Sequence, residues 1–465
     1  MQRERLGSRL GFILLSAGCA IGCGNVWKFP WLTGQNGGGA FVVLYLIFLV
    51  ILGLPVMVME FALGRASQAS PVGLYQKLEK PGQKWHIHGK VALVANFLLM
   101  MFYTSVTGWI LYFFVSFLTG KMTGITDEAS SNLFGGMLSN PAVMVGFMAI
   151  VVVMGFAILS IGLQKGVENV TKYMMVALLF LMIVLAVNSF TMAGAKEGLT
   201  FYLKPDFTKV TGNTVVAAMN QSFFTLSLGI GSMAIFGSYI GKERSLMGES
   251  INVLVLDTFV AIVAGLIIFP ACYTFDVEPG AGPGLLFVTM AKVFNNMSGG
   301  RWWGTLFFLF MFFAAMSTIL AVFENILACM REITGWGRKK ASIICGVMVL
   351  VLSIPCALGF NLWAGFVPFN TGSSFLDLED FFVSYCALPL GSLCYVLFCT
   401  TKKGWGFENF LKEANEGKGL KFPKWLYPYL RYVLPIIIIV LFVVGIATFP
   451  FADDFTIWSW LKSLI

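Results

Sequence analysis

The stretch Gly18-Cys19-Ala20-Ile21-Gly22-Cys23-Gly24-Asn25 interrupts the first hydrophobic segment of the chain, which resumes with Val26-Trp27-Lys28-Phe29-Pro30. Each glycine weakens a helix by about 1 kcal/mol relative to alanine. Unwound backbone at membrane depth is tolerated only where protein buries it or where it lines a cavity. The stretch therefore predicts a binding site near the middle of a membrane.

The composition is that of a polytopic membrane protein embedded in a lipid bilayer. Hydrophobic residues make up 58% of the 465 residues and charged residues 12%, whereas a soluble domain carries about 25% charged residues. The net charge of +8 is explained by basic cytoplasmic loops, so no nucleic-acid partner is expected. The nine cysteines fall mostly in apolar segments and predict no disulfide framework.

Eleven hydrophobic segments are long enough to cross a bilayer core, which needs roughly 20 residues per helix. They lie at about 9–34, 39–64, 89–119, 141–160, 166–192, 215–240, 248–275, 302–331, 340–359, 376–400 and 433–450. Lysine and arginine are concentrated in alternate loops, such as 65–90 and 402–431. This asymmetry predicts a cytoplasmic N-terminus and an extracellular C-terminus. The apolar loop near 276–300 is expected to fold over the outer face as a lid.

The sixth segment contains a second glycine-rich interruption, Ser227-Leu228-Gly229-Ile230-Gly231. A pair of interrupted segments at corresponding positions of two halves is typical of a transporter's substrate site. Glycines also serve close helix packing, and for one segment alone that explanation would be preferred. Two breaks five segments apart favour a single transporter domain over 1–450, with inverted repeats at 1–192 and 215–400. An extra helix at 433–450 and an extracellular tail at 451–465 complete the predicted organisation.

Broken helices expose backbone N–H groups that favour anions and carbonyl groups that favour cations. Sodium, like other hard cations, takes oxygen ligands. The side chains that supply oxygen near the breaks are Asn25, Thr225, Ser227, Ser317 and Thr318. The two adjacent hydroxyls of Ser317 and Thr318 have an alternative role, which is to bond back to their own helix.

Four acidic residues stand out within or at the ends of the hydrophobic segments: Glu60, Asp257, Glu324 and Asp380. Each costs about 2.5–3.5 kcal/mol to insert, so each needs a partner or a role. We expect Glu60 and Glu324 to accept hydrogen bonds from unwound backbone, and Asp257 to be a charged sodium ligand. Two gate pairs are predicted, Lys28 with Asp380 outside and Arg3 with Glu332 inside.

At these positions the chain resembles the neurotransmitter:sodium symporter family, in particular its bacterial amino-acid transporters. The matching stretches are Arg9-Leu10-Gly11, residues 22–30, 36–41, 53–55 and 221–229, together with Glu60 and Gly64-Arg65. The likeness runs from about residue 3 to 450. It implies an all-α membrane protein with the leucine-transporter (LeuT-like) fold: eleven transmembrane helices, a 5+5 inverted repeat, and broken helices 1 and 6. It also implies the plasma membrane of a bacterium.

The resemblance implies two sodium ions and an amino-acid substrate. The first sodium site would comprise Ala20, Asn25, Thr225 and Asp257, and the second Gly18, Ile21, Ala314, Ser317 and Thr318. The substrate carboxylate would meet Cys23, Gly24 and Tyr103, with Gly22 leaving it room, and the ammonium would meet Ala20, Phe224, Thr225 and Ser227. The apolar wall would comprise Cys19, Leu99, Phe224, Ile230, Ala321 and Val322, with Thr318 also counted as substrate-binding and with Phe224 and Tyr103 as the outer lid.

Departures from the family pattern carry their own expectations. Chloride dependence in the family rests on a serine where this chain has Ala261, and Asp257 replaces the commoner asparagine. A fixed carboxylate in place of the anion predicts transport without chloride. Lys28 stands where the family has an arginine in the outer gate, and it keeps the charge but cannot make the paired hydrogen bonds of a guanidinium to a carboxylate. Val176 stands where segment five often has proline, which questions how that helix unwinds.

The expected function is sodium-coupled import of a neutral, bulky hydrophobic or aromatic amino acid by a monomer or dimer. An amino-acid-gated receptor or channel of the same fold is the alternative. A membrane enzyme is disfavoured, because the only histidines, His86 and His88, lie in an inner loop with no accompanying catalytic motif.

Overall fold

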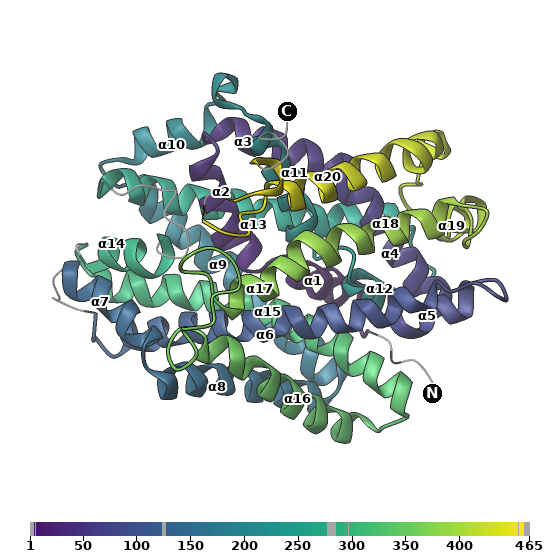
Figure 1. Ribbon diagram of the computed structural model, residues 1–465, viewed down its shortest axis with the longest axis horizontal. Helices are drawn as coiled ribbons and strands as arrows, with labels where there is room; N and C mark the ends of the chain where they lie inside the picture. The colour runs from purple at the N-terminus through teal and green to yellow at the C-terminus, as the bar shows by residue number, and fades with distance from the viewer. Residues whose placement is uncertain are drawn as a thin grey trace.

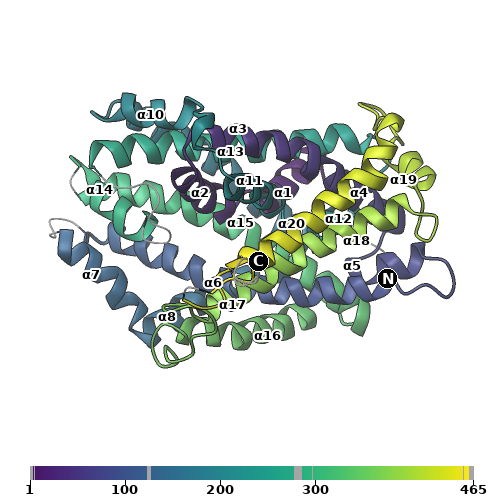
Figure 2. The same cartoon turned by 45° about the horizontal axis from the view of Figure 1, so that its top comes forward.

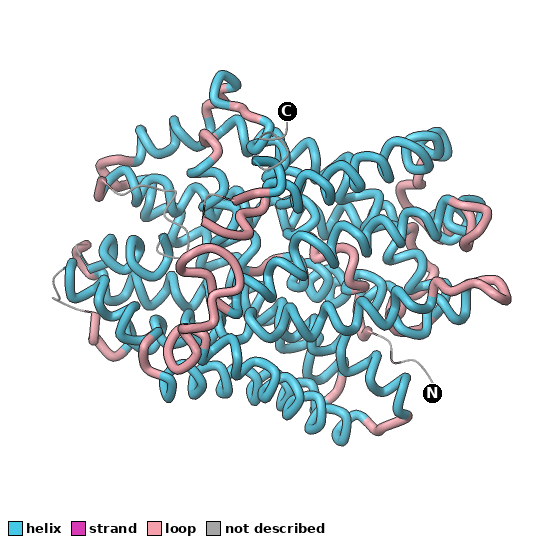
Figure 3. The backbone as a smooth tube through the Cα atoms, viewed as in Figure 1, coloured by secondary structure: helices cyan, strands magenta, loops and turns pink. Residues whose placement is uncertain are grey.

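In the computed structural model, described residues are 4, 6–122, 127–276, 285–295, 297–453 and 455–459. Among them, regular structure is helical apart from two isolated β-bridges (Figure 3). The α-helices are α1 (Arg9–Ala20), α2 (Phe29–Gln35), α3 (Gly39–Phe48), α4 (Leu54–Ser67), α5 (Pro71–Leu78), α6 (His86–Leu118), α7 (Asp127–Leu138), α8 (Pro141–Ile161), α9 (Asn169–Phe190), α10 (Ala195–Leu203), α11 (Gly212–Thr225), α12 (Ser232–Gly237), α13 (Leu246–Thr274), α14 (Ala291–Asn295), α15 (Gly300–Thr334), α16 (Arg338–Leu358), α17 (Phe375–Asp380), α18 (Leu388–Thr400), α19 (Phe407–Ala414) and α20 (Leu434–Thr448).

Nine helices of the described chain are long and apolar enough to cross a membrane. Their bounds are Gly39–Ser67, His86–Leu118, Pro141–Ile161, Leu163–Phe190, Leu246–Thr274, Gly300–Thr334, Arg338–Leu358, Phe375–Thr400 and Lys424–Thr448. One further span, the first in chain order, is Arg9–Ala20 with Gly24–Gln35, and it is bent by 51°. In chain order, Phe375–Thr400 is the tenth span. The remaining predicted segment is interrupted after Thr225, and its second half, α12, has only six residues. The eleven predicted segments are therefore present, with breaks in the first and sixth.

Several spans extend beyond the predicted bounds, because short π-helical or 3₁₀ turns continue them. The fifth begins at Leu163 rather than 166, through a π-helical turn over Leu163–Glu168. The eleventh begins at Lys424 rather than 433, through a 3₁₀ turn and a π-helical turn. These turns keep the helical direction while changing the backbone hydrogen-bond register, a change that hydrophobicity alone does not reveal.

The centre of the molecule is α15, which packs against α6, α9 and α1. Its most apolar window is 83% buried inside the protein. A helix that is apolar all round is stable only when other helices surround it. The broken first helix lies against α15 and α13, so its irregular backbone is shielded from lipid.

The connecting helices separate into two ends of the molecule (Figures 1 and 2). Helices α7, α10 and α14 lie at the left end of both views, and α5 and α19 lie at the right end. The loops that the charge pattern groups together as cytoplasmic thus share one end, opposite the loops grouped as extracellular.

The two acids expected to bond unwound backbone behave differently. Glu60 accepts hydrogen bonds from the N–H groups of Gly229 (2.6 Å) and Met233 (3.2 Å), which confirms the expectation for this residue. The expectation for Glu324 is wrong, because its carboxylate pairs with Arg338 and accepts from the Tyr239 hydroxyl. Arg338 begins the next helix, and hydropathy gives no sign that it folds back to reach Glu324.

The predicted lid near 276–300 falls partly on residues 277–284 and 296, which lie outside the described residues. The described part, from Leu285 to Asn295, is helical. Phe287 in this part packs edge-on against Trp27 and Trp109, with ring centroids 6.4 and 5.8 Å away. This segment therefore touches the outer half of the broken first helix.

Candidate substrate and ion site

The break in the first helix leaves carbonyl groups pointing away from the helix ladder. α1 ends at Ala20, and Ile21 adopts an extended conformation with ψ 103°. The chain resumes as a π-helical turn at Gly24, where the Gly22 carbonyl accepts from the N–H groups of Asn25 and Val26. Glycines at 22 and 24 allow neighbouring side chains to pack closely against this bend, because a Cβ at either position would meet those side chains.

One cluster of oxygen atoms lies between the end of α1 and the middle of α15. The Thr318 hydroxyl is 3.3 Å from the Gly18 carbonyl oxygen and 3.1 Å from that of Ile21. The Ser317 hydroxyl is 3.3 Å from the Ile21 carbonyl oxygen and 2.8 Å from that of Ala314 in its own helix. The structure thus brings together all five oxygens that the family resemblance implies for the second sodium site. Ser317 also makes the back-bond that was the alternative role.

A second cluster surrounds Asp257 of α13. The Asn25 side-chain amide donates to the Asp257 carboxylate over 2.8 Å, and the Thr225 hydroxyl lies 3.2 Å from it. The Asn25 side-chain oxygen accepts from the Gly22 N–H over 3.1 Å. Ala20, the fourth predicted ligand, ends α1 beside the same turn.

The charge of Asp257 has no counter-charge among the described side chains. The carboxyl group is completely buried, and none of the described lysines, arginines or histidines forms an ion pair with it. Burying an isolated carboxylate is costly, and two neutral donors do not cancel its charge. A small cation held between Asp257 and neighbouring oxygens would complete this arrangement.

The break in the sixth helix lies directly against that of the first. The Gln221 amide donates to the Gly24 carbonyl (2.8 Å), and the Ser227 hydroxyl lies 3.4 Å from the Cys19 carbonyl oxygen. Ser227 has φ 50°, a left-handed conformation that costs a non-glycine residue of order 1 kcal/mol. The two interrupted segments therefore form a single site.

Sequence reasoning missed two asparagines that hold the second break. The Ile230 carbonyl accepts from the amide of Asn96 on α6 (2.8 Å) and from that of Asn325 on α15 (3.4 Å). Both asparagines are fully or almost fully buried. Buried amides inside apolar spans were the available signal, because such groups need partners.

Between the breaks lies a cavity of about 20 Å³, room for about one water molecule. Its lining comprises Cys19, Ala20, Gly22, Gly24, Leu99, Tyr103, Phe224, Ser227, Ile230, Thr318, Val383 and Leu388. Val383 and Leu388 of the tenth span were missed by the sequence prediction. Ala321 and Val322, predicted for the apolar wall, are buried but do not border the cavity. Cys23 borders the outer cavity instead, and Thr225 is turned toward Asp257.

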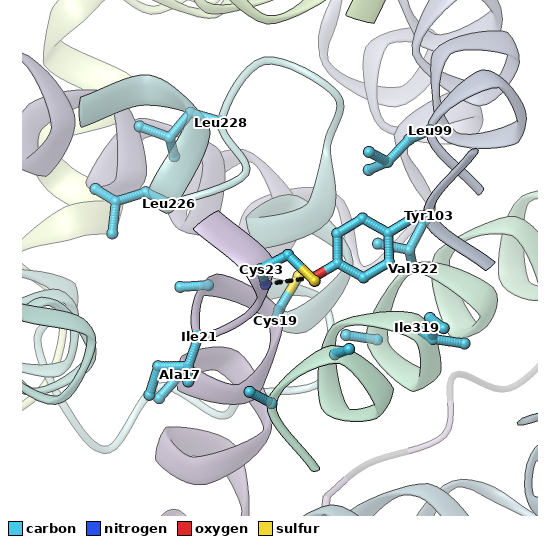
Figure 4. Packing of buried hydrophobic residues seen from close by; sticks show 14 of the residues in the cluster. Ala17, Cys19, Ile21, Cys23, Leu99, Tyr103, Leu226, Leu228, Ile319 and Val322 are labelled. Carbon is cyan, nitrogen blue, oxygen red and sulfur yellow. Dashed lines mark hydrogen bonds between the residues drawn. The ribbon is translucent and has the colours of Figure 1, made fainter. Parts of the chain in front are cut away.

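The Tyr103 hydroxyl closes one side of the cavity. It accepts a 2.8 Å hydrogen bond from the Cys23 N–H, which is drawn as a dashed line in Figure 4. A Cβ atom on Gly22 would lie 2.3 Å from this hydroxyl and 2.4 Å from that of Thr318. Any Cβ at position 22 would therefore have to displace both hydroxyls.

Phe224 separates this cavity from an outer one of about 180 Å³, and both Phe224 and Tyr103 line the two cavities. The Lys28 ammonium lies 3.8 Å from the centre of the Phe224 ring. It is also 3.9 Å from a carboxylate oxygen of Asp380. The predicted outer pair thus lies at the outer end of the site, with an aromatic ring beneath it.

Comparison with known proteins identifies the family of this chain. The family model described as "Sodium:neurotransmitter symporter family" matches residues 3–132 and 136–464. The chain belongs to this family. An uncharacterized sodium-dependent transporter, YhdH of Bacillus subtilis, is 34% identical over 450 residues, covering 95% of this chain and 98% of that relative. A Haemophilus influenzae sodium-dependent transporter is 32% identical over 455 residues, with coverage of 95% and 98%.

A solved structure has the same fold. The crystal structure of MhsT in complex with L-phenylalanine is 37% identical, with a TM-score of 0.87, and the match covers 95% of this chain and 100% of MhsT. This member of the sodium symporter family is therefore an integral membrane transporter with the leucine-transporter fold, and not an enzyme.

The end of the molecule that the sequence predicts to face the cytoplasm is closed by contacts that the sequence did not predict. Glu4 pairs with Arg331 (2.6 Å) and Arg338 (3.0 Å), and Arg9 pairs with Glu249 (3.0 Å). Burial raises the pKa of Glu4, but the two arginines outweigh it and hold the pKa below its usual value. Of the predicted inner pair, Arg3 lies outside the described residues, and Glu332 accepts from the Ser70 N–H.

Proposed function

We propose that this symporter imports a neutral, bulky hydrophobic or aromatic amino acid by alternating access, with two sodium ions and without chloride. The observation that carries the proposal is the fully buried Asp257 carboxylate, which accepts hydrogen bonds from the neutral side chains of Asn25 and Thr225 and forms no ion pair with a described side chain. A sodium ion supplies the missing positive charge. The same carboxylate supplies the negative charge that an anion supplies elsewhere in the family, and Ala261 one turn later offers no hydroxyl to hold chloride.

The composition of the cavity wall supports the substrate class. Leu99, Ile230, Val383 and Leu388 present apolar side chains, which reject charged substrates but separate apolar ones by only about 1–3 kcal/mol per methylene. MhsT, whose structure contains L-phenylalanine, is 37% identical to this chain. Because the cavity is about 20 Å³, a bulky side chain enters only when its walls move apart.

The proposed coupling places substrate and ion in mutual contact. The N–H groups of Cys23 and Gly24 take the substrate carboxylate, and Tyr103 exchanges its bond with Cys23 for one to that carboxylate. The other face of the carboxylate meets the sodium held by Asn25 and Asp257. Each ligand then raises the affinity for the other, and the effect is reciprocal.

Two sodium ions are sufficient for concentrative uptake. Each ion yields about 2.3 kcal/mol from 100 mV, and a tenfold sodium gradient adds about 1.4 kcal/mol. The total of roughly 7 kcal/mol corresponds to a limiting accumulation of about 10⁵-fold for a neutral zwitterion. The second ion is assigned to the oxygens of Gly18, Ile21, Ala314, Ser317 and Thr318.

We also infer the organisation of the chain in the membrane. Residues 1–192 and 215–400 are the inverted repeats of one transporter domain, 433–450 is the added helix, and 451–465 is an extracellular tail. The basic loops place the N-terminus in the cytoplasm of a bacterial cell. The working unit is a monomer or dimer, because one chain supplies every proposed ligand.

The test is uptake of labelled L-phenylalanine into sealed proteoliposomes under an imposed inward sodium gradient. Accumulation above the outside concentration, abolished by potassium in place of sodium, is expected. Replacing chloride with gluconate should leave uptake unchanged. Passive equilibration would overturn the proposal in favour of a channel, and sodium-dependent binding without uptake would favour a receptor.

A further inference from the structure

A second, larger cavity opens on the side of the molecule, between α6 and the tenth span. Its volume is about 540 Å³. Exposed apolar side chains form its rim: Ile87, Val91 and Val94 from α6, and Phe382 and Leu390 from the tenth span. Such side chains within membrane-spanning helices face lipid. We call this cavity the α6–α18 groove.

Small residues make the α6–α18 groove deep. Ala92 and Ala95 form its α6 wall, and Gly391 forms part of the opposite wall. A Cβ on Gly391 would lie 2.0 Å from the Gly229 carbonyl oxygen, so α18 touches the unwound backbone of the sixth helix. The groove therefore reaches from the lipid to Gly229 and Ile230, which form its floor.

One end of the groove is basic. Lys84 and Trp85 line that end. The Lys80 ammonium donates to the carbonyl of Lys402 (3.1 Å), which ties the loop before α6 to the loop after α18. Trp85 donates likewise to the Lys403 carbonyl (2.8 Å).

The acid in this loop does not offset the basic end. Glu79 accepts from the His86 ring over 2.6 Å and from the His86 N–H over 3.1 Å, and its single negative charge is outnumbered by Lys80 and Lys84. The ammonium of Lys84 is in an exposed residue at the mouth of the groove. The charge that this end presents to a ligand is therefore positive.

We propose that the α6–α18 groove binds one acyl chain of an anionic phospholipid, whose phosphate lies at Lys84. Ile87 to Leu98 extends over roughly 17 Å at 1.5 Å per residue, close to the roughly 15 Å depth of one leaflet's hydrocarbon. Tryptophan and lysine at one end match the height at which lipid headgroups lie. A basic residue near anionic lipid contributes about 1 kcal/mol, so the charged end selects the headgroup while the apolar wall holds the chain.

The bound lipid also acts on the amino-acid site, an effect that rests on the proposed function. Ile230 borders both the α6–α18 groove and the small cavity between the breaks. Its carbonyl accepts a hydrogen bond from the side chain of Asn96, the residue that directly follows the groove-lining Ala95 on α6. A chain seated in the groove fixes α6 and Ile230 in one arrangement, and this changes the affinity for substrate.

The lipid site is tested by native mass spectrometry of the full-length protein in detergent, with palmitoyl-oleoyl phosphatidylglycerol or phosphatidylcholine added. We expect one phosphatidylglycerol to be retained in preference to phosphatidylcholine, and Lys84→Gln to reduce that preference about fivefold. The control is Lys165→Gln, an exposed lysine away from the groove, which should change nothing. Equal retention of both lipids, or equal effects of the two variants, would overturn the site.

The coupling is tested with a variant that fills the groove. Val91→Trp should displace the retained lipid and change the dissociation constant for labelled L-phenylalanine at least threefold in phosphatidylglycerol nanodiscs. Ile343→Trp, on the lipid-exposed side of α16, is the matched control. Displacement without a change in that constant would overturn the coupling. Lipid retention is measured without substrate or gradient, so a failure of the proposed function is separable from a failure of the lipid site.

Discussion

The carboxylate of Asp257 accepts a 2.8 Å hydrogen bond from the side-chain amide of Asn25, 232 residues earlier in the chain. This bond joins the unwound part of the first helix to α13 at a place where both side chains are fully buried. The carboxylate is thereby oriented without being neutralised. A site of this kind binds a small cation through charge and selects it through the surrounding neutral oxygens.

Replacing the charge at this position should weaken sodium binding. In Asp257→Asn, we expect the half-saturating sodium concentration for L-phenylalanine binding to rise at least tenfold, about 1.4 kcal/mol, because a charged ligand becomes neutral. Asp453→Asn, an exposed acid whose carboxylate accepts from Thr371, is the control and should leave the value unchanged. A half-saturation in Asp257→Asn equal to that of the parent would contradict the assignment.

Uptake should come to require chloride when the carboxylate of Asp257 is removed and a hydroxyl is introduced at position 261. The double variant Asp257→Asn with Ala261→Ser recreates the family's commoner pair, so its uptake should depend on chloride while the parent's does not. The measurement is initial uptake in chloride against gluconate. Ala261→Ser alone should stay independent, because Asp257 still supplies the negative charge. Chloride-independent uptake by the double variant would count against this explanation.

Phe224 and Tyr103 should cover the bound substrate less firmly when the Lys28 ammonium, which lies over the Phe224 ring, is removed. A cation–π contact contributes about 0.5–2 kcal/mol, so Lys28→Gln should speed release of bound L-phenylalanine to the outside roughly two- to thirtyfold. Lys28→Arg should retain slow release, because it keeps both the charge and the partner Asp380. Lys209→Gln, an exposed outer lysine, is the control. Unchanged release from Lys28→Gln would show that Phe224 closes the site unaided.

A methyl group at position 22 should abolish binding of L-phenylalanine. In Gly22→Ala, the new Cβ would lie 2.3 Å from the Tyr103 hydroxyl and 2.4 Å from that of Thr318. Such contacts must be relieved by moving both groups, so we expect loss of L-phenylalanine binding with retained folding. Gly212→Ala, where a Cβ meets nothing within 4 Å, is the control. Parent-like affinity in Gly22→Ala would refute the proposed placement of the substrate carboxylate.

The ion pairs of Glu4 with Arg331 and Arg338 should stabilise the protein less at acid pH. The pKa of Glu4 is held below its usual value of 4.5 by Arg338 and Arg331, against the opposing effect of burial. A lowered carboxyl pKa gives stability that is present above the unfolded-state pKa and lost as pH falls through the folded-state pKa.

Thermal stability of the parent should therefore fall below about pH 4.5 by more than that of Glu4→Gln. Because Glu4 is partly exposed, the difference should be about 1 kcal/mol or less. The measurement is the melting temperature of both proteins from about pH 6 to pH 3. If the melting temperatures of the two proteins fell in parallel with pH, the ion pairs of Glu4 would make no contribution to stability.

The sequence predicted the fold through features that act locally. Hydrophobic length fixed the number of spans, because about 20 apolar residues are needed to cross the bilayer. The glycines near 18–24 and 227–231 located both breaks, because they weaken a helix wherever it lies. Glu60 was placed correctly by the same reasoning, since a buried carboxylate near unwound backbone finds free N–H donors.

The sequence did not predict contacts that depend on how helices lie against each other. Glu324 pairs with Arg338 from the next helix, and Glu4 reaches the same arginine from the N-terminus. Val383 and Leu388 border the cavity in place of the predicted Ala321 and Val322, because the rotation of a uniformly apolar helix carries no signature in its sequence. In such helices every face is hydrophobic, and only packing chooses the face that meets the cavity.

By itself, then, the sequence determined an eleven-segment membrane protein with two interrupted helices and a set of oxygen-bearing residues beside them. Only the tertiary structure decided that Thr318 meets the carbonyls of Gly18 and Ile21, and that Asp257 meets Asn25 and Thr225. The physical reason is the distance along the chain over which each property is set. Unwinding is a property of neighbouring residues, whereas an ion site requires oxygens from distant segments to converge within hydrogen-bonding distance, and the packing of whole helices sets that convergence.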